Sequence, residues 1–196
     1  MPEPPTIAAN GERAVPARAS ALARVALPGR FGADKGDPGI KLSVRHPASI
    51  VTVIACKGAA ERLAGVLQGL EGCSVHWAGF EQYYVVAEGR AEGSLYRELK
   101  DKLDHLASVS EQSHGRIIIR VAGPKSRNVL AKGTAVDLHG DSFPIGKSAA
   151  TQMAHVGVHL TRIGENSFEL AAFRGFAESF WEWLTEQAEE FGYRIV

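Results

Sequence analysis

The chain has 196 residues, enough for one compact domain or for two small halves that share a core. Its hydrophobic content of 45% excludes a disordered protein, and its 22 basic and 22 acidic side chains leave no net charge. Because no basic excess is available to neutralise phosphates, we expect no nucleic-acid partner, whereas a near-neutral surface favours association with another protein.

The first part of the chain is rich in proline. Residues 1–41 carry six of the nine prolines and develop no periodic apolar face beyond a short patch of alanine and leucine. We predict an extended N-terminal arm over residues 1–41, with a disordered tail at residues 1–10. Residues 27–42 are expected to stay extended until they lie on another subunit.

Signals for export, membrane insertion and metal binding are weak. No apolar segment behind basic residues resembles a signal peptide, and the most apolar run, residues 50–56, is far shorter than the roughly 18 residues of a membrane span. We therefore expect a soluble cytoplasmic protein with no membrane partner. Cys56 and Cys73 match no zinc or redox spacing, and Cys56 is interpreted as a small buried packing residue at the end of a strand.

The remainder, residues 42–196, is predicted as a single folded domain of two similar halves, about 42–108 and 109–196. In the first half, a β-branched run at residues 50–55 predicts a buried strand, and leucines at helical spacing predict a helix at residues 59–70. This strand and helix form a unit that the second half repeats.

The second half begins with a strand predicted at residues 116–121. Gly123 then forms the corner that Gly58 forms in the first half, and each glycine is followed four residues later by an arginine. A helix is predicted at residues 124–131, with Pro124 as its first residue, because the missing N–H of proline costs nothing there.

The later elements of the two halves also correspond. A strand at residues 83–86 matches one at residues 168–171, and each is followed by a helix, the second at residues 176–191. The second half holds an insertion of about 20 residues, 132–151. Coincidence is the alternative, because alternation of strands and helices is common. We predict an α+β fold of two strand–helix–strand–strand–helix halves.

The helix predicted at residues 176–191 separates apolar from acidic side chains. One arc is apolar and comprises Phe176, Phe180, Leu184, Ala188 and Phe191. The opposite face is acidic and comprises Glu178, Glu182, Glu186, Glu189 and Glu190. We interpret it as a solvated face, with docking of a basic partner as the alternative. Trp181 and Trp183 lie at the borders of the arc, where either packing or subunit contact suits tryptophan.

Several motifs resemble catalytic or binding sites without meeting their requirements. The loop at residues 140–148 has five residues between its glycines, whereas the phosphate-binding Walker loop needs four. A strand predicted at residues 152–161 contains His155 and His159, which would then lie about 13 Å apart, too far to share a metal ion. Asp137 and His139 could pair as a carboxylate and a base, but no nucleophile is identifiable beside them.

The polar run at residues 110–115 precedes the strand of the second half. A connecting turn is its simplest explanation, and a wall of polar side chains facing a cavity is the alternative. Taken by themselves, the residues predict no catalytic, cofactor-binding or metal-binding side chain in this chain.

Several segments of the chain share a sequence pattern with one known family. They are residues 28–32 (PGRFG), 111–116 (EQSHGR), 123–133 (GPKSRNVLAKG), 137–139 (DLH), 143–146 (FPIG) and 173–184 (FRGFAESFWEWL). With these segments the chain resembles the gamma subunit of heterotetrameric sarcosine oxidase. The resemblance extends over about residues 28–193 and departs from the expected pattern at Glu111, where aspartate is expected.

This resemblance implies a duplicated α+β fold similar to the folate-binding domain of the glycine-cleavage T-protein. It also implies a four-subunit flavoenzyme that converts sarcosine, tetrahydrofolate and oxygen to glycine, methylenetetrahydrofolate and hydrogen peroxide. FAD, FMN, NAD, tetrahydrofolate and zinc are then expected on the alpha, beta and delta partner subunits and none on this chain, which would serve assembly and stability.

Two alternatives stay open at this point. The chain could be the gamma-type subunit of a sister amine dehydrogenase, such as an N-methylglutamate dehydrogenase. It could also be a free-standing folate-binding module, in which Gln112, His114 and Arg116 converge on a pocket between the halves.

Overall fold

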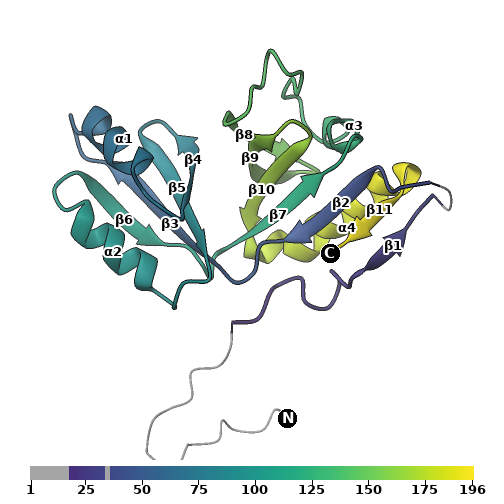
Figure 1. Cartoon of the computed structure of the whole chain (residues 1–196), viewed down its shortest axis with the longest axis horizontal. Helices are drawn as coiled ribbons and strands as arrows, with labels where there is room; N and C mark the ends of the chain where they lie inside the picture. The colour runs from purple at the N-terminus through teal and green to yellow at the C-terminus, as the bar shows by residue number, and fades with distance from the viewer. Residues whose placement is uncertain (1–17, 34–35) are drawn as a thin grey trace, which may run out of the picture.

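The computed structural model describes residues 18–33 and 36–196, so the tail predicted at residues 1–10 lies outside the described residues. Two sheets, each with helices on one face, stand beside each other as two lobes (Figure 1). The lobes correspond to the two predicted halves, and strands and helices alternate in both, so the prediction of a duplicated α+β fold is confirmed.

The first half forms an antiparallel four-stranded sheet of order β4-β5-β3-β6, with two helices. Its elements are β3 (Ala48–Ala55), α1 (Ala60–Gln68), β4 (Ser74–Gly79), β5 (Gln82–Glu88), α2 (Ser94–Lys102) and β6 (Ala107–Glu111). Val51 and Val53 of β3 alternate with Ile50 and Thr52, so one face packs on Leu63, Leu67, Leu95 and Leu99 of the helices.

The second half contributes most of a seven-stranded sheet of order β1-β11-β2-β7-β10-β9-β8. Its elements are β7 (Arg116–Ala122), α3 (Ser126–Ala131), β8 (Ser148–Met153), β9 (Val156–Gly164), β10 (Ser167–Phe173), α4 (Ala177–Ala188) and β11 (Tyr193–Ile195). Short 3-10 helices, η1 (Arg174–Phe176) and η2 (Glu189–Phe191), flank α4.

The two halves are joined because the strand preceding each half pairs in the other sheet. Strand β2 (Ile40–Val44) pairs with β7 of the second half before the chain crosses to β3. Strand β6 pairs with β3 of the first half before the chain crosses to β7. Both connections run between the lobes at their base (Figure 1). Opening the sheets relative to each other would therefore strain both connections.

The N-terminal segment packs on this chain and not away from it. Strand β1 (Gly29–Phe31) pairs with β11, and β2 pairs with β11 and β7. Leu22 is fully buried in the core of the second half. The expectation that residues 27–42 wait for another subunit is therefore wrong for these strands, because they pair within the chain, β1 on one side and β2 on both.

The inner faces of the two sheets meet in a third apolar cluster. Residues whose side chains alternate away from the helices supply it: Ala48, Ile50, Ala78, Tyr84, Val86, Ile118 and Ala171. In β7, for example, Ile117 and Ile119 face the helices, whereas Ile118 faces the other sheet. The β-branched run at the start of the second half is thus buried on both faces.

Three local expectations were wrong. Helix α3 begins at Ser126, so Pro124 precedes the helix and is not its first residue. Residues 152–161 form no single strand, because a turn with positive φ at Ala154 and His155 separates β8 from β9. Phe176 precedes α4 and is 52% exposed.

The packing of the last helix otherwise follows the predicted arc. Phe180, Leu184 and Ala188 are fully buried, and all five glutamates of the opposite face are exposed. Trp181 is buried at 3% exposure and lies inside the core, not at its border. Trp183 is half-buried over Gly133, where an added Cβ would approach the indole to 2.4 Å. Both tryptophans therefore pack within this chain.

Candidate functional site

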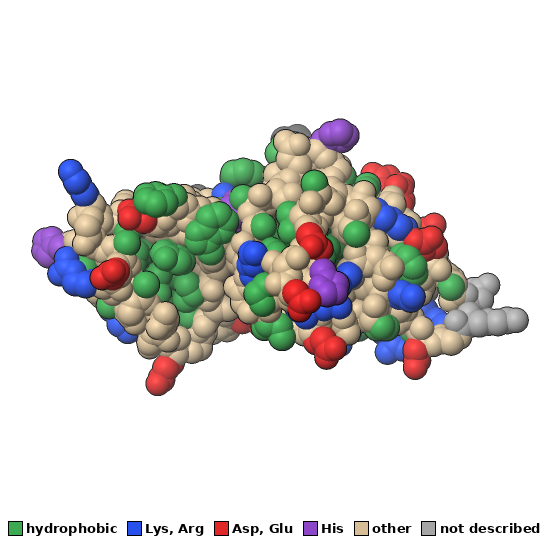
Figure 2. All heavy atoms as spheres, turned by 90° about the horizontal axis from the view of Figure 1, so that it is seen from above, with side chains coloured by type: hydrophobic (Ala, Val, Ile, Leu, Met, Phe, Trp, Pro, Cys, Tyr) green, Lys and Arg blue, Asp and Glu red, His purple; other side chains and the backbone are tan. Residues whose placement is uncertain are grey.

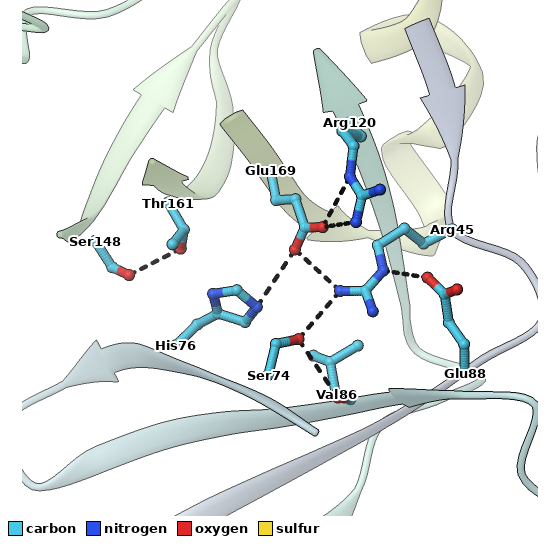
Figure 3. A network of polar contacts seen from close by, with 9 residues as sticks. All are labelled: Arg45, Ser74, His76, Val86, Glu88, Arg120, Ser148, Thr161 and Glu169. Atoms are coloured by element: carbon cyan, nitrogen blue, oxygen red, sulfur yellow. Dashed lines mark hydrogen bonds and ion pairs between the residues drawn. The ribbon is translucent and has the colours of Figure 1, made fainter. Parts of the chain in front are cut away.

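A buried carboxylate, Glu169, lies between the two sheets at the middle of β10. It points away from the helices, on the face of the sheet that meets the first half (Figure 3). Arg120 donates from Nη2 to Oε1 at 2.7 Å, and Arg45 donates from Nη1 to Oε2 at 3.0 Å. Nε2 of His76 lies 3.3 Å from Oε2. Both carboxylate oxygens are therefore engaged.

The environment of Glu169 decides its charge. Burial raises the pKa of the carboxyl, but the close contact with His76, the hydrogen bonds from Arg120 and the charge of Arg45 outweigh it and lower the pKa from 4.5 to about 2. The group is thus ionised at neutral pH. Because a carboxylate with so low a pKa has little affinity for a proton, Glu169 is a poor general acid or base at neutral pH.

The cluster connects parts of the chain that are far apart in sequence. Arg45 belongs to the connection between β2 and β3, and its guanidinium also contacts Glu88 of β5 and the hydroxyl oxygen of Ser74 in β4, the latter at 3.2 Å. Glu169 belongs to the other sheet. The arrangement holds the inner faces of the two sheets together (Figure 3). The hydroxyl of Ser74 accepts from Arg45 and donates to Val86 O at 3.4 Å, so it is bonded within the cluster and has no base among the described residues to activate it.

A cavity of ≈ 10 Å³ adjoins the cluster and has mostly apolar walls. This is about the volume that one water molecule needs. Nδ1 of His76 is buried without a hydrogen-bond partner among the described residues. His159 Nε2 donates to Ala78 O at 2.9 Å across the sheets, and its ring meets Tyr84 edge-on at 4.9 Å. Burial lowers the pKa of His159.

The Walker-like loop at residues 140–148 is a turn held by a buried arginine. Arg162 donates from Nη1 to Phe143 O at 2.9 Å and to Gly140 O at 3.4 Å. Strand β8 begins at Ser148, where a nucleotide-binding loop would continue into a helix. The loop therefore lacks the helix that follows the glycines of a Walker loop.

His155 and His159 likewise do not form a shared metal site. His155 lies in the β8–β9 turn and His159 in β9, so the prediction that both share one strand was wrong. His159 instead bonds the backbone of the neighbouring sheet at Ala78. Among residues 18–33 and 36–196, no three His, Cys, Asp or Glu side chains are arranged to hold a metal ion.

The Asp137 carboxylate bonds the backbone amide of His139 and not its imidazole ring. The amide N–H of His139 donates to Asp137 Oδ1 at 2.9 Å, and hydrogen bonds from the Ser142 side chain and this amide lower the pKa of Asp137. The histidine ring instead approaches Asp141, at 3.5 Å. This is the geometry of a polar loop and not of a base with its orienting carboxylate.

The three residues considered for folate binding separate into two environments. Gln112 bonds Ser110 at 3.2 Å, whereas His114 and Arg116 line a cavity of ≈ 20 Å³ at the base of the lobes. Pockets for ligands of cofactor size are roughly 300–1,000 Å³. The three side chains therefore do not converge on a space that fits folate.

The remaining expectations concern the cysteines and the membrane. Cys56 is exposed, so its interpretation as a buried packing residue was wrong: the chain leaves β3 before it turns inward again at Ala59. Cys73 is half-buried, and burial raises its pKa. Within the part of the chain that the structure describes, no helix has the length and apolar character to cross a membrane.

Sequence reasoning missed Glu169 and its partners. A glutamate in the middle of the apolar strand at residues 168–171 is a readable signal, since a charged side chain there must find a partner. Its partners were not readable, because Arg45 comes from a connection and His76 from another strand, and neither carries a pattern of its own.

Comparison with known proteins supplies the family. The model of the GCVT N-terminal domain matches residues 74–196. The sarcosine oxidase gamma subunit of Corynebacterium sp. (strain P-1) is 30% identical over 140 residues, covering 71% of this chain and 68% of the relative. The gamma subunit of Corynebacterium sp. (strain U-96) is 29% identical over 188 residues, covering 92% and 82%.

A solved structure has the same fold. A chain of the heterotetrameric sarcosine oxidase from Corynebacterium sp. U-96, solved with pyrrole 2-carboxylate, superposes with a TM-score of 0.75 at 24% identity. The match covers 89% of this chain and 96% of that chain. Together with the matched family model and the gamma-subunit relatives, it confirms the resemblance read from the sequence. This chain belongs to the family of sarcosine oxidase gamma subunits, built on the GCVT N-terminal domain.

Proposed function

We propose that this chain is the non-catalytic gamma subunit of a heterotetrameric, flavin-dependent sarcosine oxidase. The observation that carries the proposal is the similarity to gamma subunits along nearly the whole chain. In the assembled enzyme, sarcosine, tetrahydrofolate and oxygen are converted to glycine, methylenetetrahydrofolate and hydrogen peroxide. The cytoplasmic location is part of the same proposal.

The chemistry of the buried cluster supports a structural role. Glu169 is ionised and fully engaged by Arg45, Arg120 and His76, so it joins the sheets instead of serving a substrate. The cavities between the halves are too small for a folate or a flavin. We therefore assign FAD, FMN, NAD, tetrahydrofolate and zinc to the alpha, beta and delta subunits.

Neither alternative gains support from the relatives described above. Their names specify sarcosine oxidase and no other amine dehydrogenase. A free-standing folate module would need a pocket at Gln112, His114 and Arg116, and these side chains do not share one.

The test is co-expression of this chain, carrying an affinity tag, with the larger subunits encoded by its own organism. We expect it to retain flavin-containing subunits whose sarcosine oxidation is measured as peroxide release, while the chain alone has no flavin absorbance and no turnover. Purification of the tagged chain alone from such cells would contradict the proposal. So would sarcosine oxidation or tetrahydrofolate binding by the isolated chain.

A further inference from the structure

A small basic cavity lies at the base of the lobes, where the chain crosses twice between the sheets (Figure 1). The β6–β7 connection is bonded to β3 there: Gln112 N–H donates to Ile50 O at 2.8 Å, and Ile50 N–H donates to Ser113 Oγ at 2.9 Å. No Asp or Glu of the described residues lines the cavity. Its ionisable side chains are Arg18, Arg45, His46, His114, Arg116 and Arg174.

Only some of these basic groups have an acidic partner. Arg45 is paired with Glu169, and His114 contacts Glu92 at 2.6 Å. Among the described residues, Arg18 donates only to backbone oxygens, Ala48 O at 2.9 Å and Ser113 O at 3.2 Å. Arg174 likewise donates only to a backbone oxygen, Ala19 O at 3.3 Å. The positive charge of these two guanidinium groups is thus not compensated by a described carboxylate.

Arg116 is the most unusual member of the group. Its guanidinium carbon lies 4.7 Å from the ring centre of Tyr84 and 4.1 Å from that of Phe173, so both aromatic rings hold it in place. Nε is buried without a partner, and no side-chain hydrogen bond from Arg116 is found among the described residues. Burial lowers its pKa, as expected for a charge without a counter-ion.

We propose that this cavity binds an oxyanion, a carboxylate or phosphate group, with Arg116 as its principal ligand and with Arg18 and Arg174 adding positive charge. A guanidinium whose faces are held by aromatic rings offers its N–H edge in a fixed orientation, which suits the two oxygens of such a group. The volume of ≈ 20 Å³ suits a small anion or the end group of a longer molecule. This site goes beyond the proposed role in assembly. It is built only from described residues of this chain and does not depend on a partner subunit for its formation.

The same chemistry could be supplied by a free anion or by an acidic side chain of a partner subunit. These sources differ in one respect that can be measured. A free anion binds the purified chain and continues to bind once the subunits have assembled. An acidic side chain of a partner occupies the cavity in the complex, so free anion then binds the isolated chain only.

The experiment follows the thermal unfolding of the purified full-length chain in inorganic phosphate or formate, with sodium chloride holding the ionic strength constant. We expect a saturable rise in the unfolding midpoint of about 5–10 °C at an anion concentration of about 100 Kd. Arg116→Gln should weaken binding at least about tenfold. Arg62→Gln, which changes an exposed arginine of α1, should bind as the wild type does.

Two measurements keep the proposal testable if Arg116→Gln fails to fold. Arg174→Gln removes a charge from the exposed rim and should weaken anion binding, and phosphorus NMR of the wild type should show broadening that formate reverses. The comparison of isolated chain and complex then identifies the source, and either source agrees with the proposal. A midpoint that responds to phosphate no more than to chloride would refute it, as would an equal response in Arg116→Gln.

Discussion

The two halves share the order strand–helix–strand–strand–helix, to which the second half adds β8, but they differ in how completely they bury their apolar side chains. The second half recruits both ends of the chain: Leu22, β2 and β11 all join its core. The first half has only its own two helices. Duplication thus produced two modules of the same plan, and the chain ends reinforce only one of them.

The difference is visible on the surface. Figure 2 shows hydrophobic side chains gathered on the first half, whereas charged side chains are spread over the second. Around the β4–β5 hairpin, Phe80 is 88% exposed and Trp77 is 43% exposed. Trp77 also lines a groove of ≈ 450 Å³, whose walls combine apolar residues such as Leu70 and Val75 with Gln68. A surface of this kind is more typical of a subunit than of a monomer.

The largest effect is expected in the larger core. Phe180→Ala should lower the free energy of unfolding by about 3–5 kcal/mol, because Phe180 is fully buried and truncation leaves a cavity. Leu99→Ala, in the smaller core, should cost about 2–5 kcal/mol. Urea unfolding followed by circular dichroism should show one transition for both variants, since β2, which leads into the first half, pairs in the sheet of the second half. Two separate transitions would show that the halves unfold independently.

The contact between the halves can be broken directly. Glu169→Gln removes the charge that Arg45 and Arg120 share, and we expect a loss of about 3 kcal/mol, because it leaves the largely buried Arg45 short of a counter-charge. Glu88→Gln is the matched control: its carboxylate is 53% exposed, so the loss should stay below about 1 kcal/mol. Equal losses in both variants would show that Glu169 is not what joins the sheets.

The same carboxylate predicts a pH dependence. Its folded-state pKa is depressed from 4.5 to about 2, so its contribution is fully present above about pH 5 and is lost as the pH falls toward 2. Between pH 7 and pH 3 the loss should be about 2 kcal/mol. Urea unfolding at both pH values measures it, and Glu169→Gln should lose about 2 kcal/mol less over this range. An unchanged pH dependence in that variant would contradict the assignment.

Much of the fold could be read from the sequence because its signals are local. Gly58 and Gly123 were read as corresponding corners, and both adopt positive φ, 75° and 117°. Glycine marks such positions because other residues adopt this conformation at a cost. The turn at Ala154 and His155 also has positive φ but contains no glycine, so the run was misread as one strand.

Pairing between distant segments could not be read in the same way. The alternation of apolar and polar residues along β2 and β6 indicates which side chains are buried, but it does not indicate which sheet each strand joins. The cluster at Glu169 has the same difficulty, since Arg45 lies 124 residues away in sequence. A charged residue inside an apolar strand indicates that a partner exists, and only the tertiary structure identifies it.

The smallest effect should come from the exposed surface of the first half. Phe80→Ser should change the free energy of unfolding by no more than about 0.5 kcal/mol, because the ring is 88% exposed and contributes little to the core. Tyr84→Ala, four residues further along the same hairpin and 2% exposed, should cost about 3 kcal/mol or more. Urea unfolding of the isolated chain separates these values. A loss above about 1 kcal/mol for Phe80→Ser would mean that this ring packs within the chain, and the contrast between an outward-facing first half and a self-sufficient second half would not hold.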